Sequence, residues 1–252
     1  MEKKIGSLFW DKTKPQHLVE SDQHKKRPHP ASVNFAEKGM EDIRLPFPPF
    51  QGSVPTDFFN LVTERTSHRK YSDMPLTIEE LSFLLWCTQG VKKAWGDVST
   101  LRTVPSAGAR HALETILYIN RVQGIEKGLY GYAPLSHSIF PYDRDPLIEN
   151  SLANACYRQM FVVHAAVTFL WVAIPYRMTW RYGERGYRYL LMDVGHVCQN
   201  LYLASEVVGC GACAVGAFDD DALSTILDLD DRDAFVIYMA AVGKKLEKPD
   251  QP

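Results

Sequence analysis

Three short segments of this 252-residue chain hold residue types that could bind an anionic ligand. Segment 65–69 (Arg-Thr-Ser-His-Arg) groups cations with hydroxyls, and segment 105–111 (Pro-Ser-Ala-Gly-Ala-Arg-His) adds small residues to the same mixture. Segment 209–218 is rich in glycine and alanine, which leave backbone N–H groups accessible to a ligand. Guanidinium and hydroxyl groups form charge-assisted hydrogen bonds with phosphate. Together the three segments predict a site for an anionic, planar cofactor.

Two groups of side chains are placed to hold a phosphate. The first group follows a predicted helix and consists of Arg65, Thr66, Ser67 and Arg69. The second group follows the last predicted strand and consists of Lys244 and Lys245. A phosphate at this point would take hydrogen bonds from guanidinium and hydroxyl groups at once. On spacing alone, ordinary surface charges at element ends explain these residues better.

The glycine-rich segment matches no common nucleotide motif. It lacks the Gly-x-Gly-x-x-Gly spacing of a dinucleotide fingerprint and the Gly-Lys-Ser/Thr of a phosphate loop. Cys210 and Cys213 form a Cys-x-x-Cys that could be a redox pair or half of a zinc site. No second Cys-x-x-Cys or nearby His pair completes such a site, so we expect no metal.

Composition places the chain among globular proteins, with 46% apolar and 23% charged residues. A net charge of −2 gives no field that would gather nucleic acid or an anionic membrane. The longest apolar run, 161–174, is shorter than the roughly 20 residues of a spanning helix. The residues after Met1 form no apolar signal-peptide stretch, so we expect a cytoplasmic protein. The five cysteines are an odd number, so we expect reduced thiols.

The chain divides into residues 1–50, an extended N-terminal arm, and residues 51–252, the cofactor-binding domain. The arm is polar, interrupted by prolines and without helical or strand period, and its basic stretch 24–27 is expected to be solvated. A helix is predicted from Pro55. A second is predicted from a capping box at 77–80 to a stop at Gly90.

The remaining pattern favours an α+β fold. Residues 113–120 read as a strand that pairs with 129–132 in antiparallel fashion, residues 162–174 as a long strand and residues 234–242 as the last strand. Helices are predicted at 153–160, at 187–208 with burial on most sides, and after an Asp219 cap. The early antiparallel pair and the irregular alternation argue against a doubly wound sheet.

These segments, in this order, resemble the nitroreductase family of FMN-dependent oxidoreductases, and in particular its SagB-type dehydrogenases. The run at 105–111 and the Arg-Gly-Tyr-Arg-Tyr at 185–189 are similar to that branch, and the resemblance spans roughly Phe9 to Gly243. It implies an antiparallel-dominated sheet flanked by helices. It also implies an intertwined homodimer with FMN at the subunit interface.

The resemblance also implies roles for individual residues. Arg65 and Ser67 would bind the FMN phosphate together with Lys244 or Lys245, and Thr66 between them would belong to the same cofactor-binding segment. Arg69 would face the pyrimidine edge of the flavin. A fixed cation there stabilises the reduced flavin. Two further sets follow from the family. The loop that reaches the partner subunit's FMN would be Pro105, Ser106, Ala107 and Gly108. The backbone N–H groups near flavin N5 and O4 would be those of Val215, Gly216 and Ala217.

The function that follows is transfer of hydride or electrons from NAD(P)H through flavin N5 to a small organic acceptor, of nitroaromatic or quinone type. Few side chains need act as acid or base, so Arg69 and Gly216 are flavin-tuning candidates rather than catalysts. His196 is better explained as a hydrogen-bonded core histidine than as a proton donor.

Three alternatives stay open. The first is a SagB-type flavin dehydrogenase that oxidises azoline or other peptide-derived rings, although the chain shows no convincing Lys-Tyr pair of the kind used by azoline oxidases. The second is a flavin-binding protein without turnover. The third is a thiol oxidoreductase using Cys210 and Cys213.

Overall fold

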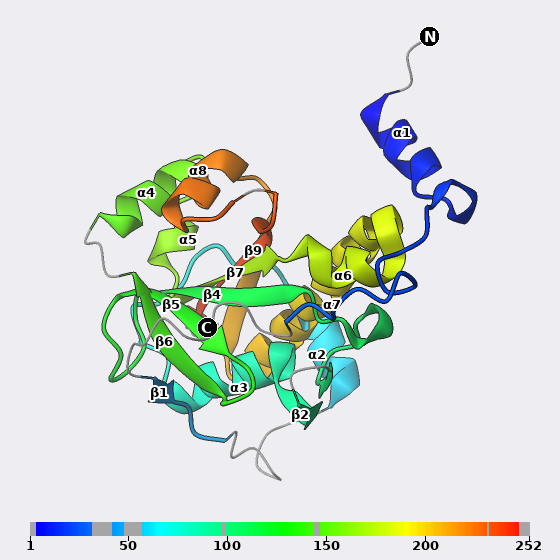
Figure 1. The fold of residues 1–252 in the computed structure, drawn as a ribbon. Helices are drawn as coiled ribbons and strands as arrows, with labels where there is room; N and C mark the ends of the chain where they lie inside the picture. Colours follow the sequence, from blue (N-terminus) through cyan, green and yellow to red (C-terminus); the bar gives the residue numbers. More distant parts are fainter. Residues whose placement is uncertain are drawn as a thin grey trace.

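A computed structural model describes residues 4–31, 42–47, 57–96, 99–143, 147–230 and 232–246. Within these ranges the centre of the molecule is a seven-stranded sheet of order β1-β6-β5-β4-β7-β9-β8, in which every pairing between neighbouring strands is antiparallel (Figure 1). The strands are β1 (Ile43–Arg44), β4 (Leu113–Ile119), β5 (Gly128–Ala133), β6 (Ser138–Asp143), β7 (Val167–Ala173), β8 (Cys210–Val215) and β9 (Phe235–Lys244). The α+β prediction and the antiparallel pair β4–β5 are confirmed.

Helices cover both faces of the sheet (Figure 1). One face carries α3 (Ile78–Gln89) and α7 (Gly186–Val207), with α2 (Phe58–Glu64) and α6 (Pro175–Tyr182) packed against α7. The other face carries α4 (Ile148–Ala155), α5 (Phe161–His164) and α8 (Asp220–Ile226). A separate hairpin joins β2 (Val91–Trp95) to β3 (Ser99–Arg102).

Strand β4 shows why the sequence of the sheet is so apolar. Leu117 and Ile119 belong to the core on the α3–α7 side, whereas Ile116 and Tyr118 belong to the core on the α4–α8 side. Because successive side chains of a strand point to opposite faces, a strand covered on both sides carries apolar residues on both faces. The buried Glu114 in the same strand pairs with Arg177 of α6.

Helix α3 begins with the predicted capping box. Thr77 Oγ1 accepts a hydrogen bond from the Glu80 N–H (3.2 Å), and the Glu80 carboxylate accepts one from the Thr77 N–H (2.9 Å). Gly90 follows as the C-cap, and Asp219 caps α8 through the Ala222 N–H (2.9 Å). Local hydrogen bonds of this kind depend on residues three positions apart, so the sequence reveals them.

Two predicted elements have different bounds in the structure. The predicted strand 162–174 begins with the short helix α5 and enters the sheet only at Val167, because periodicity cannot separate a helical turn from a strand in an all-apolar run. The predicted helix 153–160 overlaps α4, which ends at Ala155. Tyr157 and Arg158 then have φ of 51° and 58°, a left-handed conformation that cannot continue the helix.

The N-terminal arm contains regular structure where none was expected. Residues Ile5–Lys12 form helix α1, a short 3-10 turn η1 follows at Pro15–His17, and β1 pairs with β6 at the edge of the main sheet. Thr13 is buried, and its polar atoms have partners there: Arg188 Nε donates to its hydroxyl (2.6 Å) and Arg185 Nη1 donates to its carbonyl (3.1 Å). Further along, the Gln23 N–H donates to the Trp180 carbonyl of α6 (2.8 Å). The predicted boundary at residues 50 and 51 lies outside the described residues.

Helix α7 confirms the predicted helix 187–208, but its burial differs. Val194, Val197 and Leu201 face the core, whereas Leu191 and Met192 are 57% and 52% exposed in the single chain. The prediction that this helix is buried on most sides is therefore wrong for one chain alone.

Candidate functional site

Segment 65–69 lies along the outer edge of β8. Ser67 forms a parallel bridge with Ala212, and the His68 N–H donates to the Ala212 carbonyl (2.9 Å). This contact requires the glycine at position 211, since a Cβ there would stand 2.5 Å from the His68 ring. The first and third of the segments singled out in the sequence therefore meet in space.

Tyr202 of α7 joins these two segments, and sequence reasoning missed it. Its hydroxyl accepts a hydrogen bond from the Ala214 N–H of β8 (2.8 Å) and lies 3.1 Å from Ser67 Oγ. The Arg65 guanidinium lies 5.4 Å from the centre of the Tyr202 ring, in cation–π range. In the sequence, one tyrosine in a largely apolar helix is indistinguishable from a core residue.

The hydrogen bonds of Tyr202 allow Ser67 to act as a donor to a ligand. Because the Tyr202 oxygen accepts from Ala214, the Tyr202 hydroxyl can donate to Ser67 Oγ, and in that arrangement the Ser67 hydrogen can point outward. Ser67 and Arg69 are exposed, and Arg65 is half-buried. The Arg69 guanidinium lies 5.9 Å from the Phe161 ring centre, and Thr66 Oγ1 is hydrogen-bonded to His68 Nε2 (3.0 Å). Two guanidinium groups and a hydroxyl suit a phosphorylated, aromatic ligand.

The two lysines differ from their predicted placement. Lys244 is the last residue of β9 rather than a residue after it, and its ammonium group pairs with Glu80 and donates to the Val208 carbonyl (3.2 Å). Lys245 pairs with Glu206 of α7. Both cations thus already have a carboxylate partner, and their predicted contact with a phosphate stays a prediction.

Loop 105–111 is held by α7 at another point. It contains a short 3-10 turn η2 (Ala107–Ala109), whose Ala107 N–H donates to Asp193 Oδ1 (3.3 Å). The His111 N–H donates to Ser106 Oγ (2.9 Å), and Pro105 and Gly108 are exposed. Burial raises the pKa of Asp193, against the lowering effect of its hydrogen bonds to Ser106 and Ala107. The carboxylate therefore fixes the shape of the loop.

The two anchor points are well separated on α7. Asp193 and Tyr202 are nine residues apart in the same helix (202 − 193), which corresponds to about 13 Å along its axis. Within one chain, the loop and segment 65–69 are thus attached at separate points.

The end of β8 offers space for a ligand. Gly216 and Ala217 are exposed, and a Cβ added to Gly216 would meet only the Tyr238 ring, at an ordinary 3.6 Å. The packing of the chain does not itself require glycine here. The Ala217 carbonyl accepts from the Gln159 side chain (2.7 Å), which fixes the segment after Val215.

The cysteine pair does not suit redox chemistry. Cys210 and Cys213 stand three positions apart in β8, so their side chains point to opposite faces of the sheet. Burial raises the pKa of Cys210 to about 12 and also raises that of Cys213, so neither is a ready thiolate. These two observations oppose the thiol oxidoreductase hypothesis.

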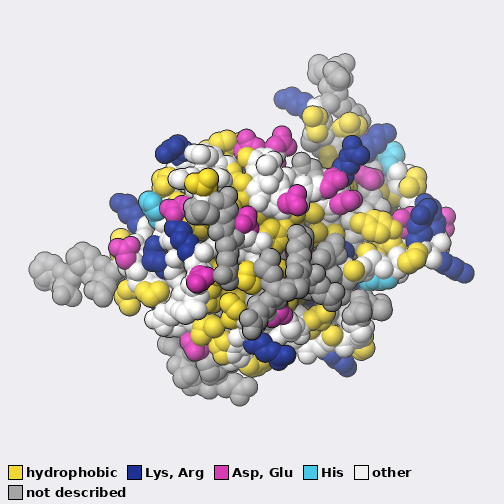
Figure 2. Space-filling view, turned by 60° about the vertical axis from the view of Figure 1, so that its left-hand side comes forward, with side chains coloured by type: hydrophobic (Ala, Val, Ile, Leu, Met, Phe, Trp, Pro, Cys, Tyr) yellow, Lys and Arg dark blue, Asp and Glu magenta, His cyan; other side chains and the backbone are white. Residues whose placement is uncertain are grey.

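The distribution of charged side chains on the surface agrees with the small net charge. On the face shown in Figure 2, lysines and arginines are interspersed with acidic residues rather than gathered into a field of one sign. In the part of the chain that the structure describes, no helix is long and apolar enough to cross a membrane.

Comparison with known proteins identifies relatives of this chain. The model of the Nitroreductase family matches residues 62–244. The protein MJ1384 of Methanocaldococcus jannaschii, which carries a nitroreductase name, is 38% identical over 188 residues, or 75% of this chain and 91% of that protein. The trifolitoxin-processing protein TfxB of Rhizobium leguminosarum is 27% identical over 136 residues, which are 51% of this chain but only 36% of TfxB.

Solved structures share the fold. A structure from Anabaena variabilis has a TM-score of 0.69 and 27% identity over 82% of this chain, which spans only 42% of that chain. The E. coli microcin synthetase McbBCD complex with truncated pro-MccB17 has a TM-score of 0.60 and 20% identity, covering 96% of this chain and 92% of that one. A structure from Desulfovibrio desulfuricans in complex with FMN has a TM-score of 0.53 and 18% identity, covering 78% and 92% of the two chains.

Proposed function

Because this chain belongs to the nitroreductase family, we propose that it is an FMN-dependent oxidoreductase that passes hydride or electrons from NAD(P)H to a small organic acceptor, of nitroaromatic or quinone type. The observation that carries the proposal is the meeting of segment 65–69 with β8 through Tyr202, inside the region that the family matches. The FMN held by the Desulfovibrio desulfuricans structure of the same fold supports the choice of cofactor.

The residues at this site fit FMN by their donor chemistry. Arg65 and the outward hydrogen of Ser67 would hold the phosphate, with Thr66 alongside. The exposed amides of Gly216 and Ala217 would approach the ring system. Bound FMN would supply a group that accepts a hydride and gives up electrons again. The Arg69 guanidinium, exposed beside Phe161, would stabilise negative charge on the reduced ring.

A homodimer with FMN at the interface belongs to the same proposal. Exposed apolar side chains lie on two helices that pack together, Phe58 and Phe59 on α2 and Leu191 and Met192 on α7. Exposed apolar side chains gathered on neighbouring helices are typical of a protein–protein interface. A second chain would cover this surface and would bring its own loop 105–108 to the site. The loop of the same chain is attached to α7 at a point separate from segment 65–69. A cytoplasmic location stays a prediction.

A second candidate function is the SagB-type oxidation of azoline or other peptide-derived rings. It is favoured by the similarity to TfxB, which is named as a trifolitoxin-processing protein, and by the match to a chain of a microcin synthetase complex with a bound precursor. That match covers 96% of this chain, more than the family model does. A flavin-binding protein without turnover is the remaining alternative.

One experiment separates these functions. Purified protein with added FMN should be yellow, should bleach anaerobically on addition of NADH or NADPH, and should regain its colour with a quinone or nitroaromatic. Binding without bleaching would favour the alternatives, and reoxidation coupled to ring oxidation of an azoline peptide would select the SagB-type reaction. A protein that takes up no FMN would refute the proposal.

The role of Arg69 has its own test. Arg69→Ala should still bind FMN but should be reduced more slowly than the native protein in stopped-flow absorbance. Arg232→Ala, which removes an exposed cation in the loop before β9, serves as the matched control. Equal reduction rates for all three proteins would contradict the assigned role.

A further inference from the structure

Two arginines from different parts of the chain meet at Gly108. Arg110 Nε donates a hydrogen bond to the Gly108 carbonyl (3.2 Å). Arg181 of α6 approaches the same residue, since its Nε lies 3.2 Å from where a Cβ of Gly108 would stand. Gly108 has φ of +58°, a conformation that glycine adopts without strain. The η2 turn thus brings the two guanidinium groups to one place.

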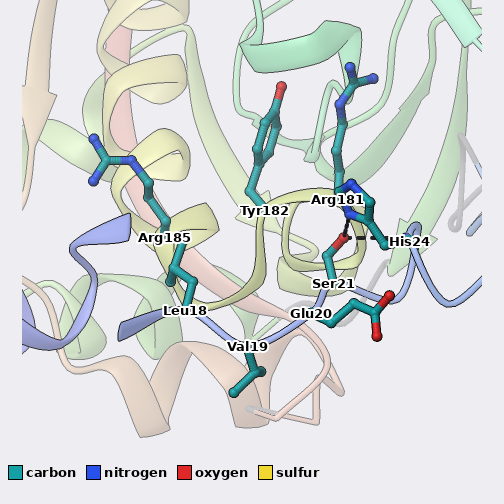
Figure 3. Close-up of a pocket in the computed structure, with 8 residues that line it drawn as sticks. All are labelled: Leu18, Val19, Glu20, Ser21, His24, Arg181, Tyr182 and Arg185. Carbon is teal, nitrogen blue, oxygen red and sulfur yellow. Dashed lines mark hydrogen bonds between the residues drawn. The ribbon is translucent and has the colours of Figure 1, made fainter. Parts of the chain in front are cut away.

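Aromatic rings hold both guanidinium groups. The Arg110 guanidinium lies 5.7 Å from the centre of the Trp180 ring, and that of Arg181 lies 5.5 Å from the centre of the Tyr182 ring. Figure 3 shows Arg181 and Tyr182 extending side by side, away from the carboxylate of Glu20. The side chains are therefore oriented before any ligand arrives, which lowers the entropy lost on binding.

Among the residues that the structure describes, no carboxylate balances the charge of this pair. Within the described ranges, neither Arg110 nor Arg181 forms an ion pair with a carboxylate, whereas the buried Arg177 pairs with Glu114. The one side-chain hydrogen-bond partner of Arg110 in those ranges is His29, a ring whose pKa is lowered by burial and by Arg110 itself. Burial and then the neighbouring Arg181 lower the pKa of Arg110. A bound anion would relieve the repulsion between the two cations.

We propose that Arg110 and Arg181 form a binding site for a carboxylate or phosphate group of a small organic ligand. Two guanidinium forks suit such a group, because each fork can donate parallel hydrogen bonds to two of its oxygens. Arg181 and Tyr182 also line a pocket of about 400 Å³ between segment 18–24 and the chain from the end of α6 to Arg185, and Glu20, Ser21 and His24 also line it (Figure 3). This pocket gives room for the rest of the ligand.

The identity of the ligand rests on the proposed function, whereas the binding of an anion does not. If the protein is the proposed flavin enzyme, the anionic group belongs to one of its two substrates. It is then either the 2′-phosphate of NADPH or a carboxylate on the electron acceptor.

Calorimetric titration with pyrophosphate at low ionic strength tests the site directly. Native protein should bind it, Arg181→Gln should bind about tenfold more weakly because a charge-assisted pair is lost, and added NaCl should weaken binding further. Arg232→Gln removes the same charge at an exposed position outside the site and should bind like the native protein. Equal affinities for Arg181→Gln and Arg232→Gln, or no binding to native protein, would overturn the proposal.

Two further variants distinguish the loss of the anion site from a loss of structure. Arg110→Gln should weaken pyrophosphate binding to a similar extent, and Arg181→Lys should give an intermediate affinity because it keeps the charge without the planar fork. Circular dichroism and the melting temperature should stay native in Arg181→Gln and Arg181→Lys, whose side chain has no hydrogen bond within the described residues. An Arg181→Lys protein as weak as Arg181→Gln but also unfolded would point to a structural role and against the site.

The source of the anionic group is decided by steady-state kinetics. A KM raised for NADPH but not for NADH in Arg181→Gln assigns the site to the 2′-phosphate. A KM raised for 4-nitrobenzoate but not for nitrobenzene assigns it to the acceptor. Unchanged KM values for all four compounds would overturn the substrate role. Binding of pyrophosphate through Arg181 in a protein that takes up no FMN would refute the proposed function and leave the anion site standing.

Discussion

At the scale of single residues, Tyr202 shows how one hydroxyl can hold a binding site together. It is the hydrogen-bond acceptor for an N–H of the edge strand β8, a partner of Ser67 and, through its ring, a support for Arg65. These three contacts connect α7, β8 and the segment after α2. A change that removes only the hydroxyl should therefore act on the donors of the proposed phosphate site rather than on the fold.

Tyr202→Phe should weaken FMN binding by up to about 30-fold, because Ser67 loses a partner and the Ala214 N–H loses its acceptor, each worth about 1 kcal/mol. Quenching of flavin fluorescence measures the affinity. Riboflavin, which has no phosphate, should bind the variant and the native protein equally. Tyr189→Phe, which also removes a hydrogen-bonding hydroxyl from α7, is the control. Equal losses for FMN and riboflavin would show that Tyr202 does not act on the phosphate.

His111 makes the protein sensitive to acid. It is buried, and its Nε2 donates to the Thr100 carbonyl (3.1 Å), a contact that by itself favours the protonated ring. Burial, with Arg102 close by, lowers its pKa to about 3. The unfolded chain takes up the proton near pH 6.5, so stability is complete above that pH and is lost as the pH falls from 6.5 towards 3.

The expected loss from His111 at pH 5 is about 2 kcal/mol, from roughly 1.5 pH units at about 1.4 kcal/mol each. Urea unfolding at pH 7.5 and pH 5 measures it. His111→Asn should lose less stability over this interval, and asparagine tolerates the φ of 44° at this position. The hypothesis fails if both proteins lose the same free energy of unfolding.

At the scale of elements, the packing of segment 65–69 on β8 determines whether the site exists. The segment can lie against the strand only where the strand has no side chain in its way, and Gly211 provides that point beneath the His68 ring. The lysine at the end of β9 and the capping glutamate of α3 are joined in the same region, since Glu80 both caps the helix and pairs with Lys244.

Gly211→Ala should cost about 1–3 kcal/mol of unfolding free energy, because its Cβ would stand 2.5 Å from the His68 ring. It should also weaken FMN binding, since segment 65–69 must move. Gly216→Ala is the comparison: its Cβ meets Tyr238 at 3.6 Å, so stability should be unchanged while FMN binding falls. Chemical denaturation and flavin titration measure both effects. Native stability in Gly211→Ala would contradict the packing argument.

At the scale of the whole molecule, the exposed apolar faces of α2 and α7 and the separate anchoring of loop 105–111 have one explanation in common. A second copy of the chain would cover the apolar residues and complete the site with its loop. Burial of apolar area stabilises such contacts by about 25 cal/mol per Å². A variant that prevents dimer formation is therefore expected to bind FMN more weakly as well.

Leu191→Glu should convert the dimer to a monomer, because it would bury a carboxylate in an apolar contact. Light scattering after gel filtration measures the mass, and flavin titration should show weaker binding in the monomer. The side chain is 57% exposed in the single chain, so circular dichroism should be unchanged. Leu135→Glu, at a 46% exposed position in the turn between β5 and β6, is the control. A monomeric native protein, or a dimeric Leu191→Glu, would refute the interface.

The sequence by itself determined those features that depend on neighbouring residues. The capping box of α3, the extent of α7 and the antiparallel pairing of β4 with β5 were predicted because hydrogen-bonding side chains and apolar periodicity lie within a few positions of each other. The choice of segments 65–69 and 209–218 was also possible from residue types and from the resemblance to the nitroreductase family.

Only the tertiary structure decided the contacts between distant residues. Tyr202 joins Ser67 across 135 positions, Lys244 pairs with Glu80 instead of standing free, and Arg110 meets Arg181 at Gly108. The short helices α1 and α5 also escaped prediction, one in a polar arm and one in an apolar run. Local propensity is weak in such stretches, so their conformation depends on packing against the rest of the chain. No short window of sequence contains those packing partners.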